Sequence, residues 1–250
     1  KAALVTGATG AIGLAICEEL LKEGITNLAV LDLHDEEPQS VENMRKEFPK
    51  SAIEYFKVDV TSDEELKQCY ESFTNKVKYL DVVVNCAGIF NEKDYKNVLA
   101  VNLGGVIGST LLAIDYMRAD ADKGRGGIVL NISSIAGLNT YAGMPIYSAT
   151  KHGVVAFTRA VSHEREELGI KFLVLCPTAT DSVLLDRICS KEYLFINSLD
   201  GIAVKSMLTV QSPCDVGKAA VQIMRDADNG DTWIIRNSEL TKASLPKAIS

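Results

Sequence analysis

The sequence lacks several features that would place it in a specialised class. Its 250 residues contain no lysine and arginine cluster and the net charge is -7, which argues against nucleic acid or an anionic membrane as the main partner. No apolar run reaches the roughly 18 to 20 residues of a membrane-spanning helix, and the first residues do not have the charged-then-apolar layout of a signal peptide. We therefore expect a cytoplasmic globular protein with no membrane and no nucleic-acid partner.

The sequence also contains few residues at spacings that suit metal binding or disulfide formation. The six cysteines include no C-x-x-C pair, and most lie in apolar segments, so we expect buried, reduced thiols. The three histidines His34, His152 and His163 are scattered. The stretch HEREE at 163–167 ends in glutamate where a zinc helix needs its second histidine. The prediction is that the protein has no metal site.

Short apolar runs of strand length recur along the chain. They are nearly continuous rather than alternating, which is typical of strands covered on both faces. Segments with helical spacing separate them, such as residues 12–23, which Gly24 ends. This alternation predicts an α/β fold in which a doubly wound parallel sheet of about seven strands has helices on both faces. The expected strands are 2–6, 28–33, 53–58, 80–85, 127–132, 171–176 and 232–236.

The chain shows no internal repeat, low-complexity tract or linker, so residues 1–250 are predicted to form a single domain. Residues 183–210 interrupt the alternation because they are apolar but irregular. A connection of this length is either a flap over a binding site or an ordinary pair of short helices. The sequence leaves these two alternatives open.

The stretch VTGATGAIG at 5–13 joins the first expected strand to the first expected helix. Its three glycines permit a tight turn, and the helix N-terminus offers unpaired N–H groups and a positive dipole end to a pyrophosphate. Asp32 ends the second strand 19 residues after Gly13, where a carboxylate can accept hydrogen bonds from an adenosine ribose. That carboxylate would repel a 2′-phosphate and neither 8–12 nor Leu33 supplies a cation, so NAD is favoured over NADP. The alternative is an ordinary turn followed by a strand-end aspartate.

Tyr147 and Lys151 lie one helical turn apart in PIYSATKHG and should face the same way. A Y-x-x-x-K pair alone is a weak motif, but a cation within about 4 to 6 Å lowers a phenol's pKa by roughly 1 to 3 units, which suits general acid–base catalysis. Pro145 predicts that the helix begins just before Tyr147. Ser134 follows the strand 127–132 at the ligand-binding edge of the sheet, where its hydroxyl either holds a substrate oxygen or satisfies local backbone.

Taken together, these motifs resemble those of the short-chain dehydrogenase/reductase family over almost the full chain. The matching stretches are TGATGAIG (6–13), DV (59–60), NCAG (85–88), VN (101–102), SS (133–134) and YSATK (147–151). The resemblance implies a Rossmann fold, a nicotinamide cofactor and the catalytic set Asn102, Ser134, Tyr147 and Lys151. In this picture Tyr147 removes the hydroxyl proton as hydride passes to nicotinamide, and Ser134 positions the oxygen. Lys151 lowers the phenol pKa and binds the ribose, while Asn102 holds a water in a proton relay.

The same resemblance implies that 1–250 is one NAD-binding catalytic domain, with 183–210 as a substrate-site flap. The cofactor-binding residues expected from it and from the glycine turn are Gly7, Thr9, Gly10, Ala11, Ile12, Gly13, Asp32, Leu33, Asp59, Val60, Asn85, Ala87, Gly88, Tyr147, Lys151, Pro177 and Thr180. The expected substrate contacts are Ser134, Met144 and Tyr147. The apolar lining candidates are Phe90, Ile135, Leu138, Met144, Leu184, Leu185 and Phe195.

Two branches of the family are similar to different parts of the chain. Residues 91–117 and 126–138 look like 15-hydroxyprostaglandin dehydrogenase, whereas 27–37 and 229–235 look like insect-type alcohol dehydrogenase. Both relatives use NAD and form dimers, and the resemblance implies the same here. Three positions depart from the family pattern. Ala11 replaces the second glycine of the turn, Thr178 replaces the glycine after Pro177, and Met144 replaces a glutamine that faces the substrate of the prostaglandin enzyme.

The sequence thus predicts an NAD-dependent oxidoreductase that transfers hydride between nicotinamide and an apolar, secondary alcohol or ketone. One alternative is 15-hydroxyprostaglandin-dehydrogenase-like oxidation of a lipid alcohol, which Met144 weakens. Another, from a different class, is a catalytically inactive NAD-binding scaffold or storage protein. A homodimer is expected, because the apolar helical segments at 111–116 and 154–157 could bury their faces against a second subunit, although they could also pack on their own sheet.

Overall fold

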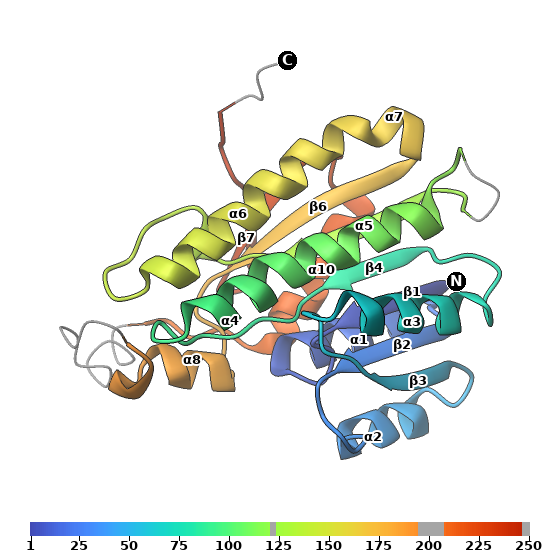
Figure 1. The fold of residues 1–250 in the computed structure, drawn as a ribbon, viewed down its shortest axis with the longest axis horizontal. Helices are drawn as coiled ribbons and strands as arrows, with labels where there is room; N and C mark the ends of the chain where they lie inside the picture. The colour runs from blue at the N-terminus through green and yellow to red at the C-terminus, as the bar shows by residue number, and fades with distance from the viewer. Residues whose placement is uncertain (121–123, 195–207, 247–250) are drawn as a thin grey trace.

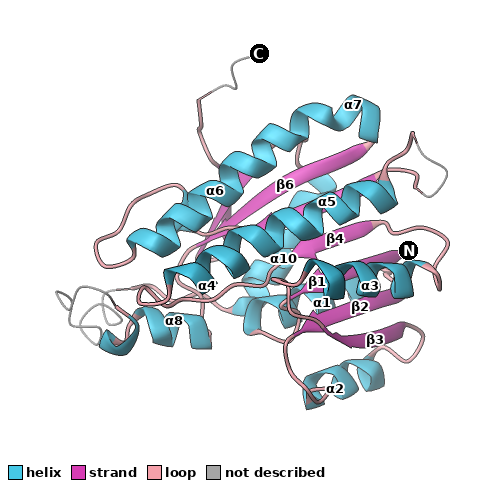
Figure 2. Cartoon of the chain, viewed as in Figure 1, coloured by secondary structure: helices cyan, strands magenta, loops and turns pink. Residues whose placement is uncertain are grey.

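In the computed structural model, one eight-stranded sheet is covered by helices on both faces, as Figure 1 and Figure 2 show. The structure describes residues 1–120, 124–194 and 208–246. The strands are β1 (Ala2–Thr6), β2 (Asn27–Asp32), β3 (Ala52–Lys57), β4 (Val82–Asn85), β5 (Gly127–Ile132), β6 (Ile170–Pro177), β7 (Thr232–Arg236) and β8 (Glu239–Lys242). The helices are α1 (Ala11–Lys22), α2 (Gln39–Glu47), α3 (Asp63–Thr74), α4 (Tyr95–Leu99), α5 (Val106–Met117), α6 (Pro145–Val161), α7 (Arg165–Leu168), α8 (Val183–Ile188) and α10 (Pro213–Asp226).

The predicted doubly wound sheet is confirmed by the strand order, which is β3-β2-β1-β4-β5-β6-β7-β8. The seven expected strands are all present and pair in parallel. The chain moves outward from β1 to β3 and then returns to place β4 on the other side of β1. This reversal opens a crevice at the carboxyl ends of β1 and β4, where sheets of this kind bind ligands.

The eighth strand, β8, was not expected from the sequence. It pairs antiparallel with β7 through a two-residue turn at Asn237 and Ser238, both of which have positive φ. Such a turn matches the twist of a hairpin, and asparagine tolerates this backbone conformation better than most residues. The strand was missed because it is short, polar and largely exposed, so it lacks an apolar pattern.

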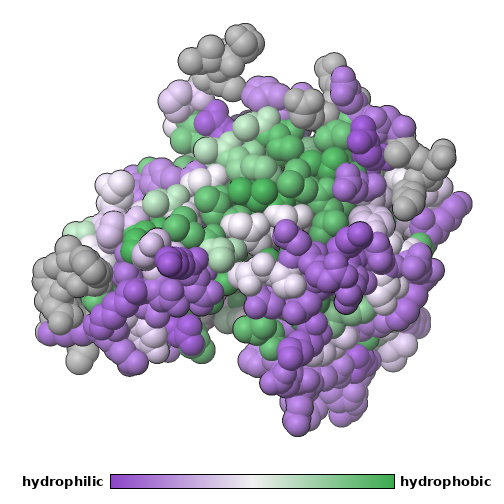
Figure 3. Space-filling model, viewed as in Figure 1, coloured by the Kyte–Doolittle hydropathy of each residue, from purple (hydrophilic) through white to green (hydrophobic). Residues whose placement is uncertain are grey.

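A long helical stretch, Tyr95–Met117, runs from α4 into α5. It has the length and composition of a helix that could cross a membrane, although no uninterrupted apolar run is long enough. In this fold it lies over the sheet, and its inner residues Ala113 and Met117 are buried in the core. Its outer side carries exposed apolar residues, and Figure 3 shows apolar side chains gathered over α5 and α6.

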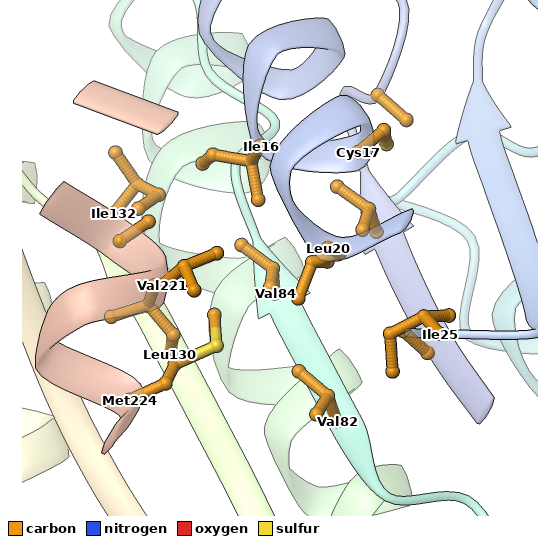
Figure 4. Close-up of a cluster of buried hydrophobic side chains, with 14 of the residues drawn as sticks. Ile16, Cys17, Leu20, Ile25, Val82, Val84, Leu130, Ile132, Val221 and Met224 are labelled. Atoms are coloured by element: carbon orange, nitrogen blue, oxygen red, sulfur yellow. The ribbon is translucent and has the colours of Figure 1, made fainter. Parts of the chain in front are cut away.

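The core has one layer on each face of the sheet. On the side of α1 and α10, Ile16 and Leu20 meet Val221 and Met224 above the strand residue Val84 (Figure 4). The two helices approach closely, since a side chain at Gly217 would lie 2.6 Å from the carbonyl oxygen of Ala15. This packing holds α1, and therefore the glycine turn before it, against the end of β1.

Candidate active site

A cavity of about 1100 Å³ opens along the carboxyl ends of the parallel strands. Its wall contains the glycine turn after β1, Asp32 at the end of β2 and the segments that follow β4, β5 and β6. Of the expected cofactor-binding residues, all line this cavity except Asn85. Ser134, Met144 and Tyr147 line it as well. The cavity therefore brings the glycine turn and Asp32 together with Ser134 and Tyr147, which lie more than a hundred residues later in the sequence.

Two of the expected residues, Asn85 and Leu138, do not line the cavity. The amide of Asn85 donates to the oxygens of Asn131 at 2.8 Å and Thr110 at 3.1 Å, so it points into the protein between β4, β5 and α5. Leu138 packs beside the buried residues Val155 and Cys176 and does not line the cavity. Phe195 lies outside the described residues. The neighbour of Asn85, Cys86, faces the cavity instead, because successive strand residues point to opposite faces.

The glycine turn provides a surface that fits a dinucleotide. Gly7 has a φ of +61°, and a side chain there would lie 2.6 Å from the Cα of Ala87. A side chain at Gly13 would lie 2.1 Å from the carbonyl oxygen of Gly7. Gly10, the residue before α1, makes no side-chain cap, so the helix N-terminus presents backbone N–H groups to the cavity. These are the properties of a pyrophosphate site.

Asp32 is held in a fixed orientation at the cavity wall. Its Oδ2 accepts hydrogen bonds from the backbone N–H of Thr9 at 2.9 Å and from the Thr9 hydroxyl at 2.6 Å. Its Oδ1 accepts from the N–H of Leu33 at 2.8 Å. A carboxylate oxygen accepts about two hydrogen bonds, so Thr9 fills the sites of Oδ2, and Oδ1 can still accept from a ribose hydroxyl. The sequence predicted Asp32 as a ribose ligand but did not indicate that Thr9 would position it.

Tyr147 and Lys151 are both buried, with 5% and 4% of their surfaces exposed. The Nζ of Lys151 lies 5.7 Å from the centre of the Tyr147 ring and donates to the carbonyl oxygen of Ile132 at 3.1 Å. The hydroxyl of Ser134 makes a hydrogen bond with the phenol of Tyr147. Its neighbour Ser133 donates to the carbonyl of Lys151 at 2.9 Å and so ties β5 to α6. The expected serine, tyrosine and lysine thus meet at one point of the cavity.

Burial controls the charge states of this pair. It raises the pKa of Tyr147 to about 12, and the hydrogen bond with Ser134 opposes this rise. It also lowers the pKa of Lys151 to about 8. The expectation that Lys151 would bring the pKa of the phenol below 10 is therefore not met in the protein itself, because burial raises this pKa more than the hydrogen bond with Ser134 lowers it.

Asn102 lies beside the cavity rather than in its wall. It is fully buried in a π-helical turn, Ala100–Gly105, between α4 and α5. Its amide donates to the carbonyl of Ile89 at 2.9 Å and accepts from the N–H of Ile89 at 2.8 Å. A side chain at Gly88 would meet both Asn102 Oδ1, at 3.6 Å, and Lys151 Nζ, at 3.5 Å. The π-helical turn thus places Asn102 on the same side of Gly88 as the lysine.

Glu92 is a buried acid that the sequence did not single out. Only 2% of its surface is exposed. Its carboxylate accepts the N–H of Tyr147 at 2.8 Å and that of Ile146 at 2.9 Å. The residue before α6, Met144, makes no side-chain cap, so Glu92 caps this helix from a distant part of the chain. The missing local cap at Met144 was the only signal in the sequence.

The segment that the sequence left open, 183–210, contributes to the cavity wall. It begins with α8 and a short 3₁₀ turn, Lys191–Tyr193, and its residues 195–207 lie outside the described part. Arg187, which the sequence analysis did not consider, is one of its cavity-lining residues. The others are Val183, Leu184, Leu185, Ile188, Leu194, Leu208 and Thr209. The segment therefore contains short helices that also form one side of the cavity.

Of the six cysteines, Cys17, Cys69 and Cys176 are buried as expected, whereas Cys86 and Cys189 are partly buried and Cys214 is exposed. Within the described ranges, no group of three or more His, Cys, Asp or Glu side chains is arranged to hold a metal ion. The cavity therefore offers proton-transfer groups and a dinucleotide surface in its described wall, but no metal ligand set there.

Comparison with known proteins gives concordant results. The family described as short chain dehydrogenase matches residues 1–192. Alcohol dehydrogenase 1 of Ceratitis cosyra is 34% identical over 97% of this chain and 94% of its own length. The human 15-hydroxyprostaglandin dehydrogenase [NAD(+)] is 35% identical over 96% of this chain and 92% of its own length. Among solved structures, levodione reductase has a similar fold, with a TM-score of 0.81, 20% identity and coverage of 95% and 96% of the two chains.

The depressed pKa of Lys151 predicts that this residue lowers the stability of the nucleotide-free protein. Its ordinary pKa is 10.5 and its value here is about 8, so the buried ammonium opposes folding fully below pH 8 and ceases to do so as the pH rises toward 10.5. We expect Lys151→Met to unfold with a free energy about 1 to 3 kcal/mol higher at pH 7, after the unpaired carbonyl of Ile132 is allowed for. The gain should shrink by pH 9.5 in urea titrations. Lys67→Met, at an exposed site on α3, should have no such effect, and a variant less stable than wild type at pH 7 would contradict the argument.

Proposed function

The chain belongs to the short-chain dehydrogenase family, and on this premise we propose that it is an NAD-dependent enzyme that transfers hydride between nicotinamide and an apolar, secondary alcohol or ketone. Family membership makes it an oxidoreductase that uses a nicotinamide cofactor. The observation that carries the finer proposal is the meeting of Ser134, Tyr147 and Lys151 in the cavity that also contains the glycine turn and Asp32.

In this proposal the dinucleotide lies along the carboxyl ends of the strands. The turn between Gly7 and Gly13 and the N-terminus of α1 hold its pyrophosphate, and Asp32 accepts from the adenosine ribose. The segments at Asp59–Val60, Ala87–Gly88 and Pro177–Thr180 enclose it from the other strands. The bound nicotinamide supplies the hydride acceptor or donor.

The chain's own residues handle the proton and the oxygen. Ser134 holds the substrate oxygen beside the phenol of Tyr147, which takes the hydroxyl proton when the alcohol is oxidised and returns it when the ketone is reduced. Burial keeps this phenol protonated near neutral pH, which favours the donor role. For oxidation, the ammonium of Lys151 stabilises the phenolate. Asn102 holds the water of the proton relay through a rearrangement of its bonds with Ile89.

The preference for NAD is supported by the charges around Asp32. A 2′-phosphate would meet the carboxylate of Asp32, which Thr9 and Leu33 hold in place. The nearest strand partner with a positive charge, Lys57, pairs with Asp35. No cation in the described wall of this end of the cavity therefore compensates a second phosphate.

We propose a homodimer formed through α5 and α6. Leu111 on α5 has 51% of its surface exposed, and Tyr95 and Leu99 on the same helical stretch are also exposed. The apolar area that Figure 3 shows over α5 and α6 is continuous across the two helices, which is typical of a surface that a second subunit covers. We also propose that the chain forms a single catalytic domain and that the protein acts in the cytoplasm. Residues 183–210 act as a flap at the substrate end of the cavity.

Tyr147→Phe removes the proton and retains the ring, so kcat should fall by about 10²-fold to 10⁴-fold. The affinity for NADH, measured by fluorescence titration, should stay within about twofold since the phenol contributes little to nucleotide binding. Turnover is read from the absorbance of the reduced cofactor with a panel of secondary alcohols. Tyr141→Phe is the matched control, because Tyr141 lines the same cavity but is exposed. Near-normal activity of Tyr147→Phe would refute the assigned role, and inactivity of the wild type toward every alcohol would favour the scaffold alternative.

Asp32→Ala should raise the ratio of kcat/KM for NADP to that for NAD by at least about tenfold, because one repulsive charge is removed and one ribose acceptor is lost. The measurement is steady-state kinetics with both cofactors at one ionic strength. Glu36→Ala removes a nearby exposed carboxylate that does not line the cavity and should leave the ratio unchanged. An unaltered ratio in Asp32→Ala would contradict the ribose contact.

Leu111→Glu should halve the mass observed by sedimentation velocity at micromolar concentration, since a buried unpaired charge is costly at an interface. Val210→Glu places the same charge at another exposed apolar site and should leave the mass unchanged. A wild-type protein that sediments as a monomer would rule out the dimer.

A further inference from the structure

The cavity contains a cation that the proposed chemistry does not use, Arg187. It lies on α8, three residues after Leu184 and directly before Ile188. At the spacing i, i+3 and i+4, the three side chains share one face of the helix. Leu184 and Ile188 pack against the cluster that contains Phe90 and Tyr147, and both they and Arg187 line the cavity. This face of α8 is therefore turned toward the catalytic tyrosine.

The guanidinium of Arg187 has no carboxylate partner among the residues that the structure describes. It lies over the ring of Tyr193, 5.5 Å from the ring centre. Four other arginines, by contrast, pair with carboxylates, and they are Arg45, Arg118, Arg125 and Arg225. A stacked guanidinium keeps its N–H donors in a fixed plane, which suits the recognition of a carboxylate.

A chain of contacts connects Arg187 to the first turn of α6. Tyr193, on which Arg187 stacks, accepts the N–H of Glu92 through its carbonyl at 2.8 Å. The carboxylate of Glu92 in turn accepts the N–H groups of Ile146 and Tyr147. Glu92 thus joins the wall that carries Arg187 to the first turn of α6, and the two ends of the substrate region are held by one buried residue.

We propose that the substrate is an apolar alcohol that also bears a carboxylate, which Arg187 binds while Ser134 and Tyr147 hold the hydroxyl. This inference rests on the proposed function. The middle of the substrate lies against apolar residues of the described wall, namely Phe90, Met144, Leu184, Ile188 and Leu194. A carboxylate is preferred to a phosphate because one guanidinium supplies one positive charge, which balances a carboxylate but not a phosphate of about two negative charges.

The test compares straight-chain hydroxy acids, with the hydroxyl on the penultimate carbon and graded chain length, with their methyl esters. In the wild type, kcat/KM with NAD should be about 10-fold to 100-fold higher for the best acid than for its ester. Arg187→Met should bring the acid down to the level of the ester, mainly through KM, and leave the ester within about twofold. Arg187→Lys should retain part of the preference. Lys191→Met, an exposed lysine in the next turn that does not line the cavity, should change neither.

Equal rates for acid and ester in the wild type would overturn the inference and leave the proposed function standing. Loss of the acid preference in Arg236→Met but not in Arg187→Met would also overturn it, since Arg236 is the other arginine in the described cavity wall. Absence of turnover with every acid, ester and neutral secondary alcohol would overturn the proposed function, and the inference with it. NADH binding by each variant verifies that it is folded.

Discussion

The burial of a lysine ammonium beside a tyrosine is the constraint on which the rest of this site depends. Lys151 keeps one hydrogen bond to protein, with the carbonyl of Ile132, and an amine in such a place gives up part of its basicity. The folded protein tolerates this because α6 buries Val154, Val155 and Thr158 against the rest of the domain. The free energy gained by packing α6 thus keeps the ammonium of Lys151 in a place from which water is excluded.

A second buried polar side chain, Glu92, fixes the first turn of the same helix, one turn before Lys151. Glu92 accepts the first backbone N–H groups of α6, including that of Tyr147. Its own N–H binds Tyr193 in the segment that walls the substrate region. The position of the phenol therefore depends on the loop after β4 and on the segment after α8, which links substrate-side packing to the geometry of proton transfer.

The helical stretch Tyr95–Met117 has three roles in the structure. Its inner side fills the core with Ala113 and Met117, its π-helical turn carries Asn102 to the edge of the cavity, and its outer side presents Leu111. Polar residues interrupt the apolar runs in this stretch, so the criterion of an uninterrupted apolar run did not identify it as one long apolar helix. A helix that is apolar on two sides needs cover on both, which the sheet provides on one side.

The sequence by itself determined the features that depend on neighbouring residues. Strand and helix alternation, the glycine turn, Asp32 at a strand end and the spacing of Tyr147 and Lys151 are patterns with short periods, and local backbone geometry decides them. The tertiary structure alone decided that Asn85 points inward, that Glu92 caps α6, that Arg187 faces the cavity and that burial sets the pKa of Tyr147. These features depend on contacts between distant parts of the chain and on the removal of water, and neither is encoded in the spacing of residues along it.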